Sequence, residues 1–313
     1  MISSKKRMTK DGPLIREDRA KSEMDLRREQ EARSKAEIKQ ELGHPRWRAF
    51  WEKEFPPWFD LGLPNPALES LLDEGDGEGT SMSSSTGSGT SRAKSTTIPN
   101  GRALVPGCAR GFDATALASE DRYVIGCDIA PLAIQSANQR LEEEMRFCEK
   151  LCVPYKPPLG KVEFREMSFF DFPTDQPEHL FDFIFDHGFL NALDHRVHDD
   201  YGKKIGELVK ENGIVVTILY PVMEKEGGPP FAVSIDRVKR IFMANAFKPL
   251  QLEPLPPHLC MPGRGGDSDF NKRDDRGSND SNAAVTVIGV WQKIYIDPDF
   301  DPEFDNEELE YSI

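Results

Sequence analysis

A glycine-containing turn followed by an acidic residue is the first pattern in this sequence that could do chemistry. The segment ALVPGCARGFD places Gly107 and Gly111 between an expected strand and an expected helix. Glycine lets the backbone turn sharply and approach a ligand closely, and a helix N-terminus offers free N–H groups. Asp128 ends the next apolar run, where a carboxylate can accept both hydroxyls of a ribose. The pattern favours a nucleoside-containing ligand over the simpler interpretation of a tight turn with a capping aspartate.

Two features favour S-adenosylmethionine over a dinucleotide as that ligand. A dinucleotide turn requires G-x-G-x-x-G to hold a pyrophosphate, and here the middle glycine is replaced by Ala109. After the third expected strand, SFFDF brings Ser168, Phe169 and Asp171 to a place where an adenine could be sandwiched and its amino group accepted. Phe169 could also be a core residue. A dinucleotide-dependent oxidoreductase therefore stays as a less favoured alternative.

A third group of polar residues follows the next expected strand. FDFIFDHG ends in Asp186, His187 and Gly188, at the carboxyl edge where ligands of open α/β sheets lie. Histidine titrates near neutral pH, so His187 is the best candidate for a general base. No segment has the spacing of a metal site, and we expect none.

Regular alternation of apolar segments positions these residues. The pattern predicts a doubly wound, mostly parallel α/β sheet covered by helices on both faces. Expected strands lie at 102–105, 123–128, 161–167, 181–186, 214–220 and 284–294, and expected helices at 113–119, 131–150, 197–210 and 234–244. Asp113 and Ser234 are expected helix N-caps, and Asn212-Gly213 an expected turn.

Composition divides the chain into segments of different character. Residues 1–42 are highly charged and predict a helical or disordered extension, and residues 297–313 predict an acidic tail. Residues 43–296 are expected to form the catalytic domain, with a Gly- and Ser-rich flexible insert at 73–98. These boundaries assume that neither end carries apolar periodicity to bury.

Charge and cysteine content exclude several classes of function. The formal net charge of -14 disfavours binding to nucleic acid or to anionic membranes. No segment reaches the ~20 consecutive apolar residues of a membrane span, and the N-terminus lacks a secretory signal. The 5 cysteines contain no CxxC pair, which favours reduced thiols and a cytoplasmic enzyme. We expect a monomer.

Longer segments of the sequence resemble a known family. They run in order from Trp47 to Ser234, and the pattern continues to VIGVWQKI. The segments are WRAFWEKEFPPWFDLGLPNPAL, LVPGCARGFD, VIGCDIAPLAI, SFFDFP, FDFIFDHGFLNAL and GGPPFAVS. In these the sequence resembles the thiopurine methyltransferase family, which includes the plant and fungal halide and thiol methyltransferases. The tryptophan-rich segment and GGPPF are the most specific parts of the resemblance.

The resemblance implies a fold, a cofactor and residue roles. The fold is a Rossmann-like class I methyltransferase with a seven-stranded sheet and an N-terminal helical lid, and the cofactor is S-adenosyl-L-methionine. Implied cofactor-binding residues are Trp47, Trp51, Trp58, Gly107, Asp128, Ser168, Phe169 and Asp186. Implied catalytic residues are His187, Asp186 and Tyr220, and His187, Phe189, Pro230 and Phe231 would face the methyl acceptor.

The sequence departs from the family at two informative positions. Ala109 stands where members usually carry glycine, so the turn must accept a methyl group. His187 stands where mammalian members have arginine and plant-type members have tyrosine. The expected acceptor is a small thiol, a halide or thiocyanate. A non-catalytic S-adenosylmethionine-binding protein is the main alternative.

The expected reaction explains the aromatic residues. Methyl transfer from a sulfonium is an in-line displacement that requires donor and acceptor at near-attack distance. A thiolate and a sulfonium give neutral products, so a dry aromatic pocket lowers the barrier. Trp47 and Trp51, one helical turn apart, would close over the site as a lid. The same spacing is also typical of a fixed core stripe.

Overall fold

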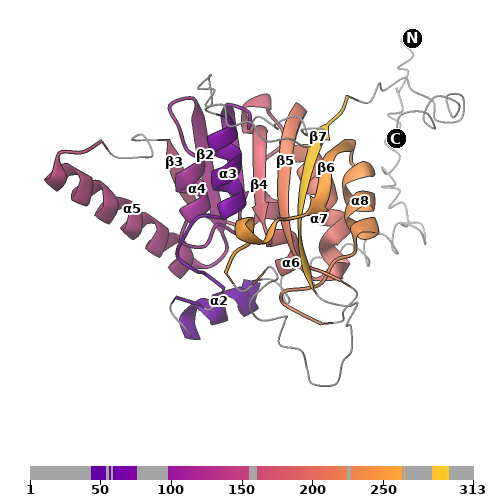
Figure 1. Ribbon diagram of the computed structural model, residues 1–313, viewed down its shortest axis with the longest axis horizontal. Helices are drawn as coiled ribbons and strands as arrows, with labels where there is room; N and C mark the ends of the chain where they lie inside the picture. Colours follow the sequence, from indigo (N-terminus) through magenta and orange to yellow (C-terminus); the bar gives the residue numbers. More distant parts are fainter. Residues whose placement is uncertain are drawn as a thin grey trace, which may run out of the picture.

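A central twisted sheet organises the protein (Figure 1). The computed structural model describes residues 44–53, 56–57, 59–75, 98–154, 161–223, 227–262, 264 and 284–295. The strands are β1 (Gly101–Pro106), β2 (Arg122–Asp128), β3 (Val162–Glu166), β4 (Phe181–His187), β5 (Val209–Val222), β6 (Phe247–Pro254) and β7 (Val285–Lys293). Their order in the 7-stranded sheet is β3-β2-β1-β4-β5-β7-β6. Only β7 runs antiparallel to its neighbours, which confirms the predicted doubly wound, mostly parallel sheet.

Alternation of side chains along the strands divides the core between the two faces of the sheet. On β1, Ala103 and Val105 join one buried cluster and Leu104 joins the other, as the period of two in a strand requires. The first face is covered by α3 (Pro66–Gly75), α4 (Phe112–Leu117) and the start of α5 (Pro131–Leu151). The second face is covered by α6 (Phe189–Ala192), α7 (His198–Leu208) and α8 (Ile235–Met243). Short 3-10 turns lie at Phe169–Asp171, Pro177–His179, His195–Val197 and Pro257–Leu259.

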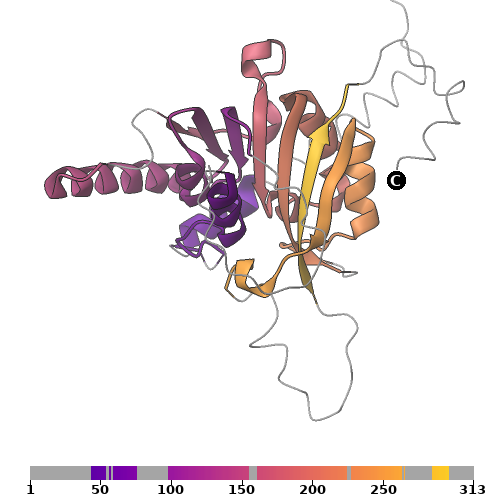
Figure 2. The same cartoon turned by 45° about the horizontal axis from the view of Figure 1, so that its top comes forward.

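Helix α5 leaves the sheet after its first turns. Its buried residues are Ala133, Ile134 and Ala137, all near its N-terminus. Two views show the remainder of the helix leading away from the sheet (Figures 1 and 2). Pro131 occupies the first turn, where a missing N–H costs nothing. The predicted start of this helix is confirmed.

Several local predictions differ from the structure. Asp113 is not an N-cap: Gly111 caps α4 without a side-chain bond, and the Asp113 carboxylate points elsewhere. Asn212 has a φ of 62° but lies within β5, beside a register shift against β4. The expected turn is therefore an irregularity inside a longer strand. Ser234 does cap its helix, because its hydroxyl accepts the N–H of Arg237 at 3.3 Å.

Three of the described elements, α3, α6 and β6, were missing from the sequence-based assignment. Helix α3 precedes the Gly- and Ser-rich insert and ends at Gly75, so residues 73–75 are helical. Strand β6 has the burial pattern of an edge strand with largely exposed side chains, so its apolar periodicity is weak.

Some predictions concern residues that the structure does not describe. Trp58, the extension at 1–42, the tail at 297–313 and most of the insert at 73–98 lie outside the described residues. The domain limits at 43 and 296 stay a prediction. Among the described residues, no helix is long and apolar enough to cross a membrane.

Candidate active site

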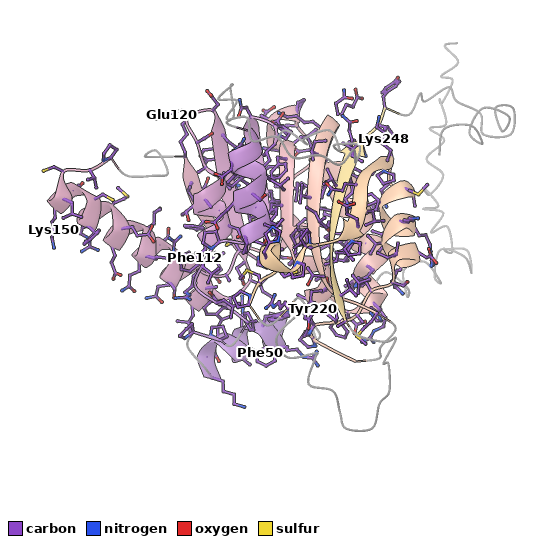
Figure 3. The ribbon with its side chains drawn as sticks, in the orientation of Figure 1. Phe50, Phe112, Glu120, Lys150, Tyr220 and Lys248 are labelled. Atoms are coloured by element: carbon purple, nitrogen blue, oxygen red, sulfur yellow. The ribbon has the colours of Figure 1, made fainter. Side chains whose placement is uncertain are left out.

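A large cavity lies at the carboxyl edge of the parallel strands, beside α2 (His44–Lys53). Its volume is about 880 Å³, within the size of small-molecule sites. Figure 3 shows Phe50 of α2 and Tyr220 of β5 at the same edge of the molecule. Of the residues expected to form the site, those on the wall are Trp47, Trp51, Gly107, Asp128, Ser168, Phe169, His187, Phe189, Tyr220 and Pro230.

The glycine turn after β1 forms part of this wall. Gly107 has a φ of 61°, and a Cβ there would lie 2.7 Å from the ring of Phe189. Gly111 has a φ of 77°, and a Cβ there would collide with the ring of Phe164. Both positions therefore require glycine. Ala109 has a φ of 49°, so this alanine occupies the left-handed conformation that glycine adopts more easily.

Asp128 is held at the end of β2 by backbone N–H groups. Its Oδ1 accepts the N–H of Ala130 at 2.9 Å, and its Oδ2 accepts the N–H of Ala109 at 3.1 Å. Burial raises the pKa of Asp128 to about 6, and these hydrogen bonds oppose the increase. Each oxygen keeps a further lone pair. The carboxylate is thus oriented at the cavity wall with capacity to accept two more hydrogen bonds.

An ion pair that the sequence-based reasoning missed braces the same turn. The guanidinium of Arg110 donates to both carboxylate oxygens of Asp60, from Nε at 2.9 Å and from Nη2 at 3.0 Å. The Asp60 side chain is 4% exposed. Such bidentate pairs are geometrically specific. The pair ties the turn to the segment between α2 and α3, and no local pattern links the two residues.

The aromatic part of the wall is also part of the core. Trp51 is 2% exposed and packs with Ala130 and Ala133. Phe169 is likewise 2% exposed, with its ring 5.2 Å from that of Phe189. Trp47 is half-buried at the edge of the cavity. Trp51 therefore anchors α2 as a core stripe would, while closure of α2 over a ligand stays a prediction.

Ser168 and Asp186 have hydrogen-bonding roles within the protein. The Ser168 hydroxyl accepts the N–H of Phe170 at 3.2 Å and caps a 3-10 turn, although the residue also lines the cavity. Asp186 is fully buried and lies behind the wall. It accepts the hydroxyl of Tyr201 at 2.6 Å and the N–H of Phe189 at 2.6 Å. Burial raises the pKa of Asp186 to about 6. Asp186 thus orients the wall without being part of it.

Histidine 187 forms a close pair with Asp113. The His187 Nδ1 lies 2.8 Å from Oδ2 of Asp113, and the Asp113 Oδ1 accepts the N–H of Asn65 at 2.7 Å. Both members of the pair line the cavity. The His187 Nε2 is buried and has no hydrogen-bond partner among the described residues. This pairing was not predicted, because Asp113 was expected to cap a helix.

The loop that carries GGPPF contributes to the wall with its prolines. Pro229 and Pro230 line the cavity near Tyr220. Phe231 does not line it: its ring lies 5.6 Å from that of His195, and its N–H donates to the Asn191 carbonyl at 2.7 Å. Phe231 therefore supports the loop and does not face the methyl acceptor as the resemblance implied.

One cationic wall residue was also missed. Arg264 lines the cavity, and its Nη2 donates to the carbonyl of Phe59 at 3.3 Å. Burial lowers the pKa of its guanidinium. It lies in a Gly- and Asp-rich segment to which the sequence analysis assigned no element and no role.

Thiols and metal ligands do not form a second kind of site among the described residues. All cysteines are free, and burial raises the pKa of Cys108 well above its usual range. A buried, protonated thiol is a poor nucleophile. Within the part of the chain that the structure describes, no group of His, Cys, Asp and Glu residues could hold a metal ion.

Comparisons with known proteins decide the family. The sequence profile of thiopurine S-methyltransferase matches residues 91–254. Thiocyanate methyltransferase 1 of Arabidopsis thaliana is 30% identical over 210 residues, covering 67% of this chain and 76% of that protein. The chain belongs to the thiopurine S-methyltransferase family. The predicted resemblance is confirmed, and the chain is an S-adenosylmethionine-dependent methyltransferase of small molecules.

A second plant relative agrees with this membership. Probable thiol methyltransferase 2 of Arabidopsis thaliana is 29% identical over 206 residues, covering 66% of this chain and 75% of that protein. Among solved structures, the N-methyltransferase NodS from Bradyrhizobium japonicum in complex with S-adenosyl-L-homocysteine has a TM-score of 0.48 and 15% identity, covering 79% of this chain and 97% of that one. The plant relatives place the similarity in the thiol and thiocyanate branch that the sequence resembled.

Proposed function

We propose that this methyltransferase transfers a methyl group from S-adenosylmethionine to a small sulfur nucleophile, a thiol or thiocyanate, or to a halide. The observation that carries the proposal is a single cavity that joins the glycine turn and Asp128 to His187, Tyr220 and Pro230. One cavity thus has room for a donor at one end and an acceptor at the other. The names of the plant relatives support a sulfur acceptor.

The residues at the donor end fit S-adenosylmethionine. The Asp128 oxygens retain lone pairs for the two ribose hydroxyls. Gly107 has a positive φ and lies against the ring of Phe189, so a side chain there would collide with that ring, and bare backbone lines the cavity at this position. Phe169 and Phe170 line the cavity with aromatic rings beside Ser168, a lining that would suit an adenine. When bound, the sulfonium supplies an electrophilic methyl group.

The residues around the acceptor end promote the transfer by positioning and by excluding water. Tyr220 at the end of β5 and Pro229 and Pro230 in the loop that follows it form part of the cavity wall. Trp47 and Phe59, whose ring centroids lie 5.3 Å apart, cover it from the α2 side. Charge is lost as an anionic nucleophile meets a cation, so a site with few competing waters favours the transition state. Aromatic faces also stabilise the cationic donor.

A methyl-transfer assay tests the proposal. Purified protein is incubated with donor labelled in its methyl group and with a panel of alkyl thiols, an aromatic thiol, thiocyanate and iodide. We expect volatile or extractable labelled product with at least one member. Binding of S-adenosylhomocysteine without transfer to any of them would instead favour the non-catalytic alternative.

We also propose the cytoplasm as the location of the enzyme. The free cysteines support a reducing compartment. Labelling of all the cysteines in protein purified without reductant is the expected result, and a disulfide would contradict the proposal.

A further inference from the structure

The paired His187 and Asp113 have a geometry that the proposed function does not yet use. The Asp113 carboxylate is held on one oxygen by the N–H of Asn65 at 2.7 Å and meets His187 Nδ1 with the other at 2.8 Å. A carboxylate accepts and does not donate, so the neutral imidazole carries its proton on Nδ1. Nε2 then carries the lone pair; it is buried and has no hydrogen-bond partner among the described residues.

We propose that His187 is the general base for an acceptor that arrives with its proton, and that Asp113 is the residue that positions it. The acceptor class is then a neutral alkyl thiol in preference to a halide or thiocyanate ion. This inference rests on the proposed methyl transfer to sulfur. To that proposed function it adds which residue takes the proton of the substrate and that the substrate arrives protonated.

The step balances in atoms and electrons. The thiol S–H bond breaks, and its proton moves to Nε2 of His187. The sulfur forms a bond to the methyl carbon, while the bond from that carbon to the sulfonium breaks and leaves its electron pair on the donor sulfur. The products are a methyl thioether, S-adenosylhomocysteine and an imidazolium that Asp113 stabilises until the proton passes to water.

A base matters for an alkyl thiol and not for an anion. Free thiols with a pKa of about 8.5 are only a few per cent ionised at pH 7. Removal of the proton within the site makes the whole thiol pool reactive. Iodide and thiocyanate carry no proton at this pH, so a base cannot assist them.

Charged and titratable groups surround the pair from several elements. Asp113 comes from α4, Tyr220 from β5 and Arg264 from the segment after Pro257–Leu259, and all three line the cavity with His187. Asp186 precedes His187 on β4, but its carboxylate is turned to Tyr201. The charged and titratable neighbours of the dyad are therefore Tyr220, Arg264 and Asp186.

The main experiment compares a thiol with an anion in His187→Gln. The full-length protein is assayed at pH 7 with 2-mercaptoethanol and with iodide, using the methyl-labelled donor. We expect the ratio of kcat/KM for the thiol to kcat/KM for iodide to fall by about 100-fold, the usual contribution of a general base. His179→Gln is the matched control, because His179 forms a similar pair with Asp175 at 3.0 Å but does not line the cavity. Its ratio should equal that of the wild type.

A pH profile separates positioning from structural support. In His187→Gln, transfer to the thiol should rise in proportion to the thiolate concentration, whereas the wild-type rate should rise less steeply with pH. Asp113→Asn lets an amide donate to Nδ1, which places the imidazole proton on Nε2 and removes the base. We therefore expect Asp113→Asn to show the same pH profile as His187→Gln. Its affinity for S-adenosylhomocysteine, measured by calorimetry, should be retained.

The outcomes distinguish this inference from the function on which it rests. Transfer to both probes with an unchanged ratio in His187→Gln overturns the role of the dyad and leaves the proposed function standing. Wild-type transfer to iodide and not to the thiol overturns the acceptor class. If the wild type methylates neither probe nor any other member of the panel, the proposed function itself fails.

Discussion

At one end of the cavity, the wall comes from α2 and from the short stretches directly after β1, β2 and β3. At the other end, it comes from β4, α4, β5 and the segment around Arg264. The first end is braced by backbone hydrogen bonds to Asp128 and by the Arg110–Asp60 ion pair. The second end keeps an imidazole nitrogen without a partner among the described residues. Rigid packing therefore belongs to the donor end and reactive groups to the acceptor end.

The comparison teaches that substituting a wall residue should affect stability differently at the two ends of the cavity. Aromatic side chains at the donor end, such as Trp51 and Phe169, are also buried core. Tyr220 and His187 at the acceptor end are only partly buried. Substitutions at the donor end should reduce stability and binding together, and those at the acceptor end should reduce transfer with less effect on stability.

The largest expected effect is on stability at the donor end. Trp51→Ala should lower the free energy of unfolding by about 3–5 kcal/mol, because a large buried side chain leaves a cavity. Trp47→Ala, at a half-buried position on the same helix, should cost clearly less. Urea unfolding followed by circular dichroism measures both. Similar losses for the two variants would show that α2 is not anchored through Trp51.

The second prediction concerns the donor affinity. Asp128→Ala removes charge-assisted hydrogen bonds worth roughly 1.5–3 kcal/mol each. We expect S-adenosylhomocysteine to bind at least about tenfold more weakly in calorimetry, since 1.4 kcal/mol corresponds to a factor of ten. Asp121→Ala, an exposed position just before the same strand, serves as the control. An unaltered affinity in Asp128→Ala would remove Asp128 from the site.

The third prediction is a pH dependence of donor binding. Since burial raises the pKa of Asp128 to about 6, the protonated form gains population as the pH falls below 6. The ionised form is the better acceptor for two hydroxyls, so affinity should fall by up to about tenfold for each pH unit below that value. Calorimetry at pH 5 and pH 7 measures this. Asp128→Asn should bind weakly with little pH dependence, and a wild-type affinity that is constant across this range would contradict the assignment.

The same raised pKa gives the stability of the ligand-free protein a pH dependence opposite to that of donor binding. Asp128 and Asp186 each have a folded pKa of about 6, above the unfolded value of about 3.9. The folded state therefore binds more protons between these values, and its stability should fall as the pH rises from about 4 to about 6. Binding strengthens over the pH range in which this contribution to stability is lost.

The smallest expected effect tests the strain at Ala109. Ala109→Gly should raise the free energy of unfolding by up to about 1 kcal/mol, because alanine at φ 49° lies in a region that glycine tolerates. Ala116→Gly, within α4, is the matched control and should cost roughly 0.5–1 kcal/mol. Thermal unfolding compares them. A destabilised Ala109→Gly would mean that the methyl group is accommodated without strain.

Features of this site could be predicted from sequence when they depend on residues close together in the chain, and not when they depend on residues far apart in it. The glycine turn, Asp128 and the SFFDF segment could be assigned because each follows an apolar strand whose neighbours share the same edge. Edge strand β6 was missed because its side chains are largely exposed. The pairing of Asp113 with His187 was missed because the two residues are 74 positions apart. For Asp113 a local role as a cap was equally consistent with its position.

By itself the sequence determined the order of the strands from β1 to β5 with α4, α5 and α7 between them, the glycine turn and the family. Local geometry explains this, since apolar periodicity and glycine positions act within a few residues. Only the tertiary structure decided that Asp60 braces Arg110 and that Phe231 turns to His195. It also decided that Nε2 of His187, whose Nδ1 meets Asp113, has no partner in the part of the chain that the structure describes. These contacts join elements that only packing brings together, and hydrogen-bond geometry on the scale of an ångström carries no signature in the order of residues.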